Sequence, residues 1–244
     1  MSSRASAIVV TALACAATAG CGGTAGSTTT KAPAPPAKAA SAPLTVASTS
    51  ATTPPPPNPK PKPKPMPDPG SLPQTDQLPS ADTAAFRGEM TALWAGVRND
   101  SLAAALPAFF PERAYAQLKQ IGDPGGDYTG RLLVDYRLDL TAAHALLGAD
   151  PAGARLVAVQ VPASYAHWVG PGACYNGVGY YEVPNARVVY RVSGELRSFG
   201  IASMISWRGV WYVVHLGAIL RPSGGGFVDD PSSGTGQSVP SSTC

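Results

Sequence analysis

Residues 187–220 read RVVYRVSGELRSFGIASMISWRGVWYVVHLGAIL and contain three runs rich in β-branched and aromatic residues. Two short breaks divide the runs, Ser193-Gly194 and Arg208-Gly209. Two-residue breaks that contain glycine, between β-prone runs, are typical of β-hairpins. The stretch therefore predicts an antiparallel meander. Its three strands cover residues 187–192, 196–207 and 210–220.

Apolar residues alternate with other residues along these strands, as they also do in one run earlier in the sequence. In a strand, every second residue faces the same side of the sheet. One face of the middle run carries Phe199, Ile201, Ser203 and Ile205. An earlier run alternates in the same way, with Val157, Val159 and Val161. We therefore expect a further strand at 157–161.

The preceding part of the chain repeats apolar residues at helical spacing instead. We expect a first helix from Ser80, which is a suitable N-cap, to residue 99. A second helix is predicted at 112–121, followed by a loop at 123–127. The residues predicted to face inward are Phe86, Met90, Leu93, Trp94 and Val97 in the first helix, and Ala114, Tyr115, Leu118 and Ile121 in the second.

Residues 132–140 fit two patterns. Alternate residues are apolar, which indicates a strand, but another set has helical spacing: Leu133, Tyr136, Leu140 and His144. We prefer a strand that leads into a short helix at 142–147. In either case helices precede the sheet, so the predicted fold class is α+β, with N-terminal helices packed on a curved C-terminal antiparallel sheet. Residues 80–221 form this single domain, and residues 222–244 are expected to be a flexible tail.

The N-terminus has the pattern of an export signal. Arg4 is followed by an apolar, uncharged run that ends in Thr18-Ala19-Gly20-Cys21. This pattern resembles the lipobox of bacterial lipoprotein signal peptides, which implies cleavage between Gly20 and Cys21 and a lipid on the Cys21 thiol. The protein would then be anchored on the outer face of the cell membrane, since two acyl chains hold stably. The alternative is an ordinary secretory signal with an incidental cysteine.

Residues 21–79 do not have the composition of a folded domain. They are rich in Pro, Ser, Thr and Ala, contain a Lys-Pro repeat at 60–65, and offer few apolar side chains to bury. We predict a disordered tether with a semi-rigid proline-rich part. Its lysines could bind anionic lipids or wall polymers, although solubility explains them equally. Residues 80–222 hold twelve Lys or Arg against eleven Asp or Glu, and this balance argues against a nucleic-acid partner.

The chain has four cysteines, Cys15, Cys21, Cys174 and Cys244. Signal cleavage removes Cys15 and lipidation uses Cys21, which leaves two thiols in a compartment that permits disulfides. We expect a disulfide between Cys174 and Cys244 that fastens the tail to the domain. The alternative is two free thiols, or thiols paired between molecules.

The order of elements resembles the nuclear-transport-factor-2-like and ketosteroid-isomerase-like fold, a cone of helices on a curved sheet. The composition is similar to that of uncharacterised actinobacterial exported lipoproteins. The stretches that carry the resemblance are AFFP at 108–111, CYN at 174–176 and SWRGVWYVVH at 206–215. The resemblance implies a pocket between helices and sheet, and it assigns no activity.

Such a pocket invites either ligand binding or catalysis. A carboxylate base beside a tyrosine donor would suit proton transfer next to a carbonyl. If the domain is an enzyme, the candidates are Asp139, His144 and Tyr136. Other polar residues in reach are Asp135, His167, His215 and Tyr180. No motif places these residues at a telling spacing, so we predict no catalytic residue, no metal and no cofactor.

The three histidines are scattered and lack the spacing of metal ligands. We interpret His144 as a hydrogen-bonded residue of the core, His215 as a hydrogen-bonded histidine of the sheet, and His167 as part of an exposed loop with Trp168. The aromatic residues of that region could stack on sugar rings, although loop packing explains them equally. They are Trp168, Tyr175, Tyr180 and Tyr181.

Two function classes remain. The first is a binding or interaction domain in the cell envelope, held by a lipid anchor, with a cell-wall or small-molecule ligand. The second is a pocket enzyme of the ketosteroid-isomerase-like type. The feature that separates them is whether an acid and a donor converge on one cavity. Neither the ligand nor the oligomeric state follows from the sequence.

The lipobox yields the first testable prediction. The native protein in the membrane fraction should begin at Cys21 and carry the mass of attached acyl chains, as measured by intact-mass spectrometry. Cys21→Ser should release the protein from membranes. A soluble native protein with an unmodified N-terminus at another residue would contradict the prediction.

Overall fold

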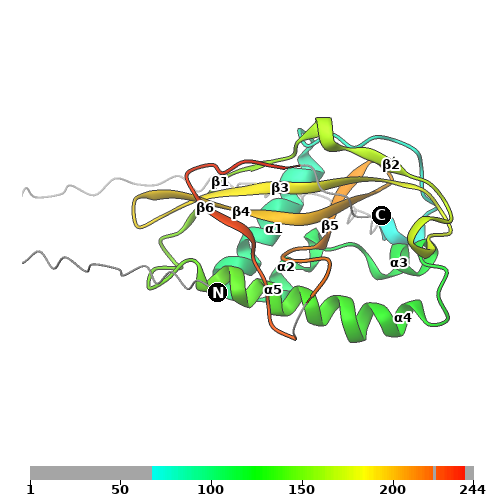
Figure 1. Cartoon of the computed structure of the whole chain (residues 1–244), viewed down its shortest axis with the longest axis horizontal. Helices are drawn as coiled ribbons and strands as arrows, with labels where there is room; N and C mark the ends of the chain where they lie inside the picture. The colour runs from blue at the N-terminus through cyan, green and yellow to red at the C-terminus, as the bar shows by residue number, and fades with distance from the viewer. Residues whose placement is uncertain (1–67, 222–223, 240–244) are drawn as a thin grey trace, which may run out of the picture. The chain divides into compact units, whose positions relative to one another are not determined.

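The computed structural model describes residues 68–221 and 224–239 (Figure 1). The predicted signal peptide, Cys21 and Cys244 lie outside these residues, as does most of the predicted tether. Within the described ranges, no helix is both long and apolar enough to cross a membrane.

The predicted meander is the centre of an antiparallel sheet. Strands β3 (Tyr180–Val192), β4 (Glu195–Trp207) and β5 (Val210–His215) follow one another in it. β1 (Arg155–Gln160) and β2 (His167–Val169) pair with β3, and β6 (Asp229–Ser233) pairs with β4. Every one of these pairings is antiparallel.

Both predicted two-residue turns are confirmed. The φ angles are 50° at Ser193 and 82° at Gly194, and 52° at Arg208 and 76° at Gly209. Two successive positive φ values match the right-handed twist of the flanking strands, which is why glycine recurs at the second position. The turns fix the β3–β4 and β4–β5 registers, in which Val192 pairs with Glu195 and Trp207 with Val210.

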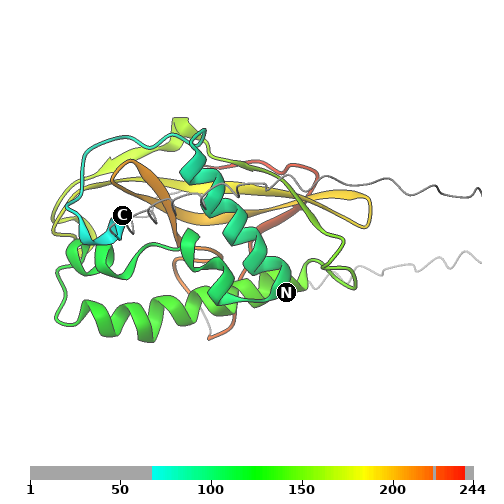
Figure 2. The same cartoon turned by 180° about the vertical axis from the view of Figure 1, so that it is seen from behind.

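The helices precede the meander and pack with the sheet, as predicted for an α+β fold. Figure 2 shows α1 crossing the sheet and α5 running lengthwise below it. The helical segments before the sheet are η1 (Pro69–Ser71), α1 (Ala84–Asn99), α2 (Leu102–Ala105), η2 (Leu106–Ala108), α3 (Glu112–Leu118), α4 (Pro124–Asp127), η3 (Tyr128–Leu132) and α5 (Leu133–Ala145). Two short 3-10 turns, η4 (Ala163–Tyr165) and η5 (Ala173–Tyr175), lie between strands.

Aromatic rings hold the helices on the sheet. Trp94 of α1 packs on Tyr190 of β3, with ring centroids 5.4 Å apart. Phe110 meets the edge of Trp207 at 5.8 Å. The apolar face predicted for the first helix is confirmed, because all five of its residues are buried. Burying such large rings removes much apolar surface from water, which stabilises the contact between the layers.

The preferred strand at 132–140 is wrong, because the segment is helical. η3 and α5 form one helical run whose inward face carries Leu132, Tyr136 and Leu140. The alternation of apolar residues that favoured a strand requires Val134 to face inward, but Val134 is 47% exposed. The loop predicted at 123–127 contains α4, which leads directly into this run.

Two smaller predictions about the helices are also corrected. The N-cap of α1 is Thr83 rather than Ser80, and its hydroxyl accepts a hydrogen bond from the Phe86 amide. α3 ends at Leu118, so Ile121 lies beyond it and is 36% exposed.

Residues 68–79, assigned above to the tether, pack on the domain. The Trp207 indole donates to the carbonyl of Pro69 at 3.0 Å, and Gln74 donates to the carbonyl of Ser206 at 2.9 Å. Gln117 donates to the carbonyl of Gly70 at 2.5 Å. Composition did not predict this packing, because it depends on hydrogen bonds from side chains of both the segment and the domain to backbone carbonyls rather than on apolar burial.

The described part of the segment after residue 221 also joins the domain, through β6. Arg187 of β3 is buried and binds both Asp230 of β6, at 3.0 Å, and Ser198 of β4, at 2.7 Å. Cys174 is disulfide-bonded. Every other cysteine of the chain lies outside the described residues, so pairing with Cys244 stays a prediction.

That pairing can be tested by peptide mapping without reduction, which should recover Cys174 and Cys244 in one linked peptide. Cys244→Ser should lower the free energy of unfolding by about 4 kcal/mol, the chain-entropy value for so long a loop. Complete alkylation of both thiols in the unreduced native protein would rule the bond out.

Candidate functional site

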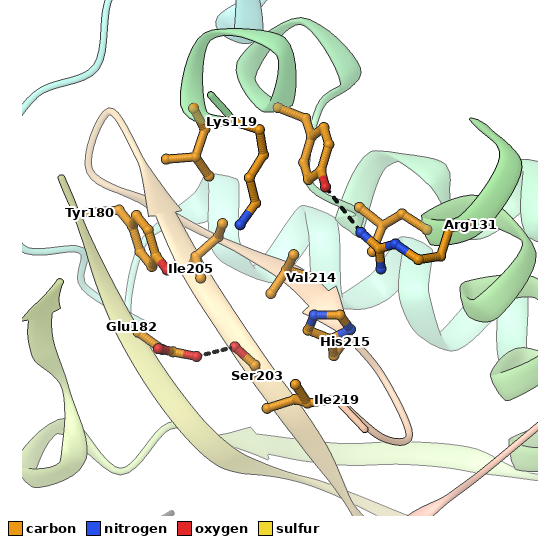
Figure 3. A pocket seen from close by; sticks show the side chains of 12 residues that line it. Lys119, Arg131, Tyr180, Glu182, Ser203, Ile205, Val214, His215 and Ile219 are labelled. Carbon is orange, nitrogen blue, oxygen red and sulfur yellow. Dashed lines mark hydrogen bonds between the residues drawn. The ribbon is translucent and has the colours of Figure 1, made fainter. Parts of the chain in front are cut away.

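A small pocket lies between the helices and the sheet (Figure 3). Its volume is about 80 Å³, which suits a ligand of a few heavy atoms. Lys119 and Arg131 enter it from the helical side, and Glu182, Ser203 and His215 from the sheet. The full lining is Tyr115, Leu118, Lys119, Arg131, Leu132, Tyr180, Glu182, Ser203, Ile205, Val214, His215 and Ile219.

Strand periodicity places the sheet residues of the pocket on one face. Tyr180 and Glu182 are two apart in β3, and Ser203 and Ile205 are two apart in β4, so each pair shares one face of the sheet. On the helical side, Lys119 directly follows Leu118, the last residue of α3. Its ammonium donates to the carbonyl of Cys174 at 3.0 Å, which fastens the η5 loop to this wall of the pocket.

Polar side chains form a row across the sheet at the floor of the pocket. His167 of β2 is the register partner of Glu182, and its Nε2 lies 3.8 Å from Glu182 Oε2. The hydroxyl of Ser203 donates to Glu182 Oε1 at 2.6 Å. Ser203 is in turn the register partner of His215 on β5. The buried carboxylate of Glu182 is thus held by one hydroxyl and faces one imidazole.

His215 lies in β5 but is not the hydrogen-bonded sheet histidine that we predicted. It is half-buried and lines the pocket, and neither ring nitrogen has a hydrogen-bond partner among the described residues. Burial, followed by the charges of Arg131, Arg221 and Lys119 in that order of strength, lowers the pKa of His215 to about 4. At neutral pH the ring is therefore uncharged, with one donor and one acceptor nitrogen.

The cations at the pocket differ in how they are paired. Arg131 binds Asp127 through two hydrogen bonds, of 2.7 and 2.5 Å, and also donates to the hydroxyl of Tyr115. That pairing lowers the pKa of Asp127, mainly through the hydrogen bonds from Arg131. Lys119 forms no ion pair within residues 68–221 and 224–239. Burial lowers the pKa of Lys119, with a further contribution from the charge of Arg131.

Asp139, the predicted base, is fully buried outside this pocket. Its carboxylate accepts hydrogen bonds from the amides of Gly217, at 2.8 Å, and Phe227, at 2.9 Å. Arg221 binds both of its oxygens, at 2.9 and 2.5 Å. Both carboxylate oxygens of Asp139 therefore already accept two hydrogen bonds each, which leaves no position for a proton from a substrate. Asp139 joins α5 to the segment after β5 and does not act as a base.

Tyr136 and His144 do not reach the pocket either. The ring of Tyr136 stacks on Phe109 with centroids 4.1 Å apart, and burial raises the pKa of its hydroxyl. His144 Nδ1 lies 2.9 Å from the carbonyl of Val97, which agrees with our interpretation of a core histidine that is hydrogen-bonded. The three predicted catalytic candidates thus do not meet at one cavity.

The remaining sequence candidates divide between packing and exposure. Trp168 packs against the edge of Tyr181 at 5.0 Å, while Tyr175 is 75% exposed. Of the aromatic residues singled out earlier, Tyr180 alone lines the pocket. Among the described residues, no group of three or more His, Cys, Asp or Glu side chains is placed to hold a metal ion.

Sequence reasoning missed Glu182, Ser203, Lys119 and Arg131. One signal was available for Glu182, which is the only charged residue between 156 and 186. A lone charge on the inward parity of a strand has to find a buried partner, and such residues often mark a site.

Comparison with known proteins adds no further assignment, since no family model, no curated protein and no solved structure matches this chain.

The structural role of Asp139 gives a testable prediction. Asp139→Asn should lower the free energy of unfolding by about 3 kcal/mol, because it leaves the buried guanidinium of Arg221 without its main charge partner. The matched control is Asp135→Asn, which removes the more exposed partner of Arg221 at 3.3 Å and should cost about 1 kcal/mol or less. Urea unfolding at pH 7 measures both values. Equal effects of the two substitutions would contradict the role given to Asp139.

Proposed function

We propose that this protein is a lipid-anchored envelope protein whose domain binds a small organic anion in the pocket between α3, η3 and the sheet. The anchor is supported by the lipobox-like end of the predicted signal peptide at Cys21. The proline-rich segment up to residue 67 would give the domain reach away from the membrane surface. Binding would then take place on the extracytoplasmic side.

The observation that carries the binding function is that two cationic side chains, Lys119 and Arg131, line the pocket together with His215. The charges of Arg131, Arg221 and Lys119 all lower the pKa of His215, and Lys119 forms no ion pair among the described residues. An anion placed between Lys119 and His215 would gain a charge-assisted hydrogen bond from the ammonium. It would also favour protonation of the His215 ring, which burial and the three cations oppose.

The lining suggests how such an anion would be oriented. Leu118, Ile205, Val214 and Ile219 offer apolar surface, while the charged groups of Lys119 and Arg131 come from the helical side. A ligand with a small apolar part and one anionic group matches this division. The carboxylate of Glu182, bonded to Ser203, would repel a second negative charge on the sheet side.

A second function, a pocket enzyme that transfers a proton next to a carbonyl, is favoured by one observation. Glu182 and Tyr180 line the same pocket, so an acid and a donor converge there, although they are not the residues predicted for these roles. Burial raises the pKa of Tyr180 to about 12, which keeps its hydroxyl protonated. In this reading Glu182 accepts the proton from carbon while Tyr180 stabilises the oxygen.

The binding function predicts a specific dependence on ligand charge. Methanesulfonate, which does not titrate near neutral pH, should raise the melting temperature by about 3 °C at ten times its Kd. Its neutral isostere dimethyl sulfone should raise it by less than 1 °C. Binding should strengthen as the pH falls from 8 to 5, because the anion raises the pKa of His215 from about 4 and a proton is taken up.

Variants separate this function from its competitor. Lys119→Met should abolish the methanesulfonate shift, whereas Glu182→Gln should preserve or strengthen it, since a nearby negative charge is removed. Equal shifts from the sulfonate and the sulfone would overturn anion binding. A turnover of a carbonyl substrate that Glu182→Gln removes, with an unchanged melting temperature, would establish the enzyme instead.

A further inference from the structure

A second cavity, away from the anion pocket, lies between α1 and β5. It is an open groove of about 550 Å³, within the size range of sites for small molecules. Its lining is largely apolar and aromatic and includes Leu106, Pro107, Phe109, Pro111, Tyr128 and Tyr212. None of its lining residues is shared with the pocket that holds Lys119 and His215.

One carboxyl group, that of Glu89 on α1, lies in this apolar lining. Its Oε2 is buried and has no hydrogen-bond partner among the described residues. The hydroxyl of Tyr212 on β5 acts on the same carboxyl group and lowers its pKa. No lysine, arginine or histidine belongs to the described lining of the groove. A buried carboxyl oxygen without a partner is costly, so this atom has unused capacity to accept a hydrogen bond.

The groove also has room beside the carboxyl group. Gly88 precedes Glu89 and lines the groove, and a Cβ atom built on Gly88 would meet nothing within 4 Å. Leu106 on the opposite lining is 43% exposed, which leaves apolar surface open to a ligand. The hydroxyl of Tyr128 is already used, because it donates to the carbonyl of Phe110 at 3.0 Å. Polar recognition in the groove therefore depends on Glu89 and Tyr212.

We propose that this groove binds an organic ammonium compound, with the ammonium group on Glu89 and an apolar body against Leu106, Phe109 and Tyr212. The unpartnered Oε2 would accept a hydrogen bond from the ammonium, and the two charges would compensate each other away from water. The aromatic lining would cover the apolar body and adds attraction for a cation over its rings. An anionic ligand would be repelled by the same carboxyl group.

The charge state of Glu89 makes ammonium binding depend on pH, which purely hydrophobic binding would not. Burial raises the pKa of Glu89 to about 8, against a smaller opposing effect of the Tyr212 hydrogen bond. The other titratable groups near the groove are Tyr212, on which Asp68 acts, and Tyr128, on which Glu112 acts. Both tyrosines have raised pKa values, so they stay protonated throughout the range from pH 6 to pH 8.

Binding of an ammonium ligand at pH 6–7 must therefore release a proton from Glu89. The ionised fraction of Glu89 is about one hundredth at pH 6 and about one half at pH 8, so affinity should rise about 50-fold between them. The ligand itself keeps its charge over this range, because alkylammonium groups titrate near pH 10.

The test uses the full chain and two probes of matched shape, cyclohexylmethylammonium and cyclohexylmethanol. Isothermal titration calorimetry at pH 6 and pH 8, in two buffers of different ionisation enthalpy, measures affinity and proton release together. We expect about one proton released per ammonium bound at pH 6 and about 50-fold tighter binding at pH 8. The alcohol should bind weakly, release no proton and show no dependence on pH.

Two variants locate the binding site. Glu89→Gln should remove the proton release and reduce the affinity for the ammonium at pH 8 at least tenfold, while binding of the alcohol stays unchanged. Gly88→Leu should fill the groove and weaken both probes at least tenfold, and leucine suits a helix interior better than glycine does. Lys119→Met, in the other pocket, is the matched control and should change neither.

A measurement without ligand keeps the proposal falsifiable if Glu89→Gln folds poorly. Because the folded-state pKa of Glu89 is raised, wild-type protein should lose stability as the pH rises from about 6.5 to 8, a range in which His215 is largely neutral in both the folded and the unfolded state, and Gly88→Leu should retain that loss. The proposal is overturned if the ammonium binds without proton release or if Gly88→Leu leaves its affinity unchanged. It is also overturned if the ammonium shows no saturable binding at concentrations up to about 10 mM, a limit that includes weak small ligands.

Discussion

The buried carboxylate of Asp139 is the constraint on which the C-terminal half of this structure depends. A charge without solvent has to be compensated by hydrogen bonds and an opposite charge. Asp139 meets this need with the amides of Gly217 and Phe227 and with the guanidinium of Arg221. A Cβ atom on Gly217 would approach the Asp139 carboxyl carbon to 2.9 Å and the Phe227 carbonyl oxygen to 2.0 Å, so only glycine fits there. These bonds hold the segment after β5 against α5.

The path set by Asp139 reaches both the pocket and the sheet edge. Ile219, between two of the residues bound to Asp139, is part of the pocket lining. The charge of Arg221 contributes to the lowered pKa of His215. Beyond Phe227 the chain forms β6, where Asp230 pairs with the buried Arg187 of β3. The hydrogen bonds of Asp139 therefore fix the segment that carries Arg221 and the pocket residue Ile219. The same segment continues to β6.

The two cavities show how carboxyl groups acquire different chemistry from their surroundings. Glu182 lies on a strand, receives a hydrogen bond from Ser203 and has His167 across the sheet. Glu89 lies on a helix in an apolar groove, with an oxygen that has no partner among the described residues and a pKa raised to about 8. Burial in the second environment favours the neutral form of the acid. The proposed ammonium site follows from the unpartnered oxygen of Glu89, whereas the proposed anion site follows from the cations Lys119 and Arg131 in the other cavity.

The sequence alone determined the local features of this protein. The alternating runs and the turns at Ser193-Gly194 and Arg208-Gly209 predicted the meander, because strand period and turn conformation depend on neighbouring residues only. The apolar spacing from Phe86 to Val97 predicted a helix for the same reason. The tertiary structure decided what depends on distant partners. It made 132–140 a helix by burying Tyr136 and Leu140, and it gave Asp139 to Arg221, 82 residues further along the chain. It also brought Lys119, Glu182 and His215 to one pocket from three separate elements, a convergence that no spacing along the chain encodes.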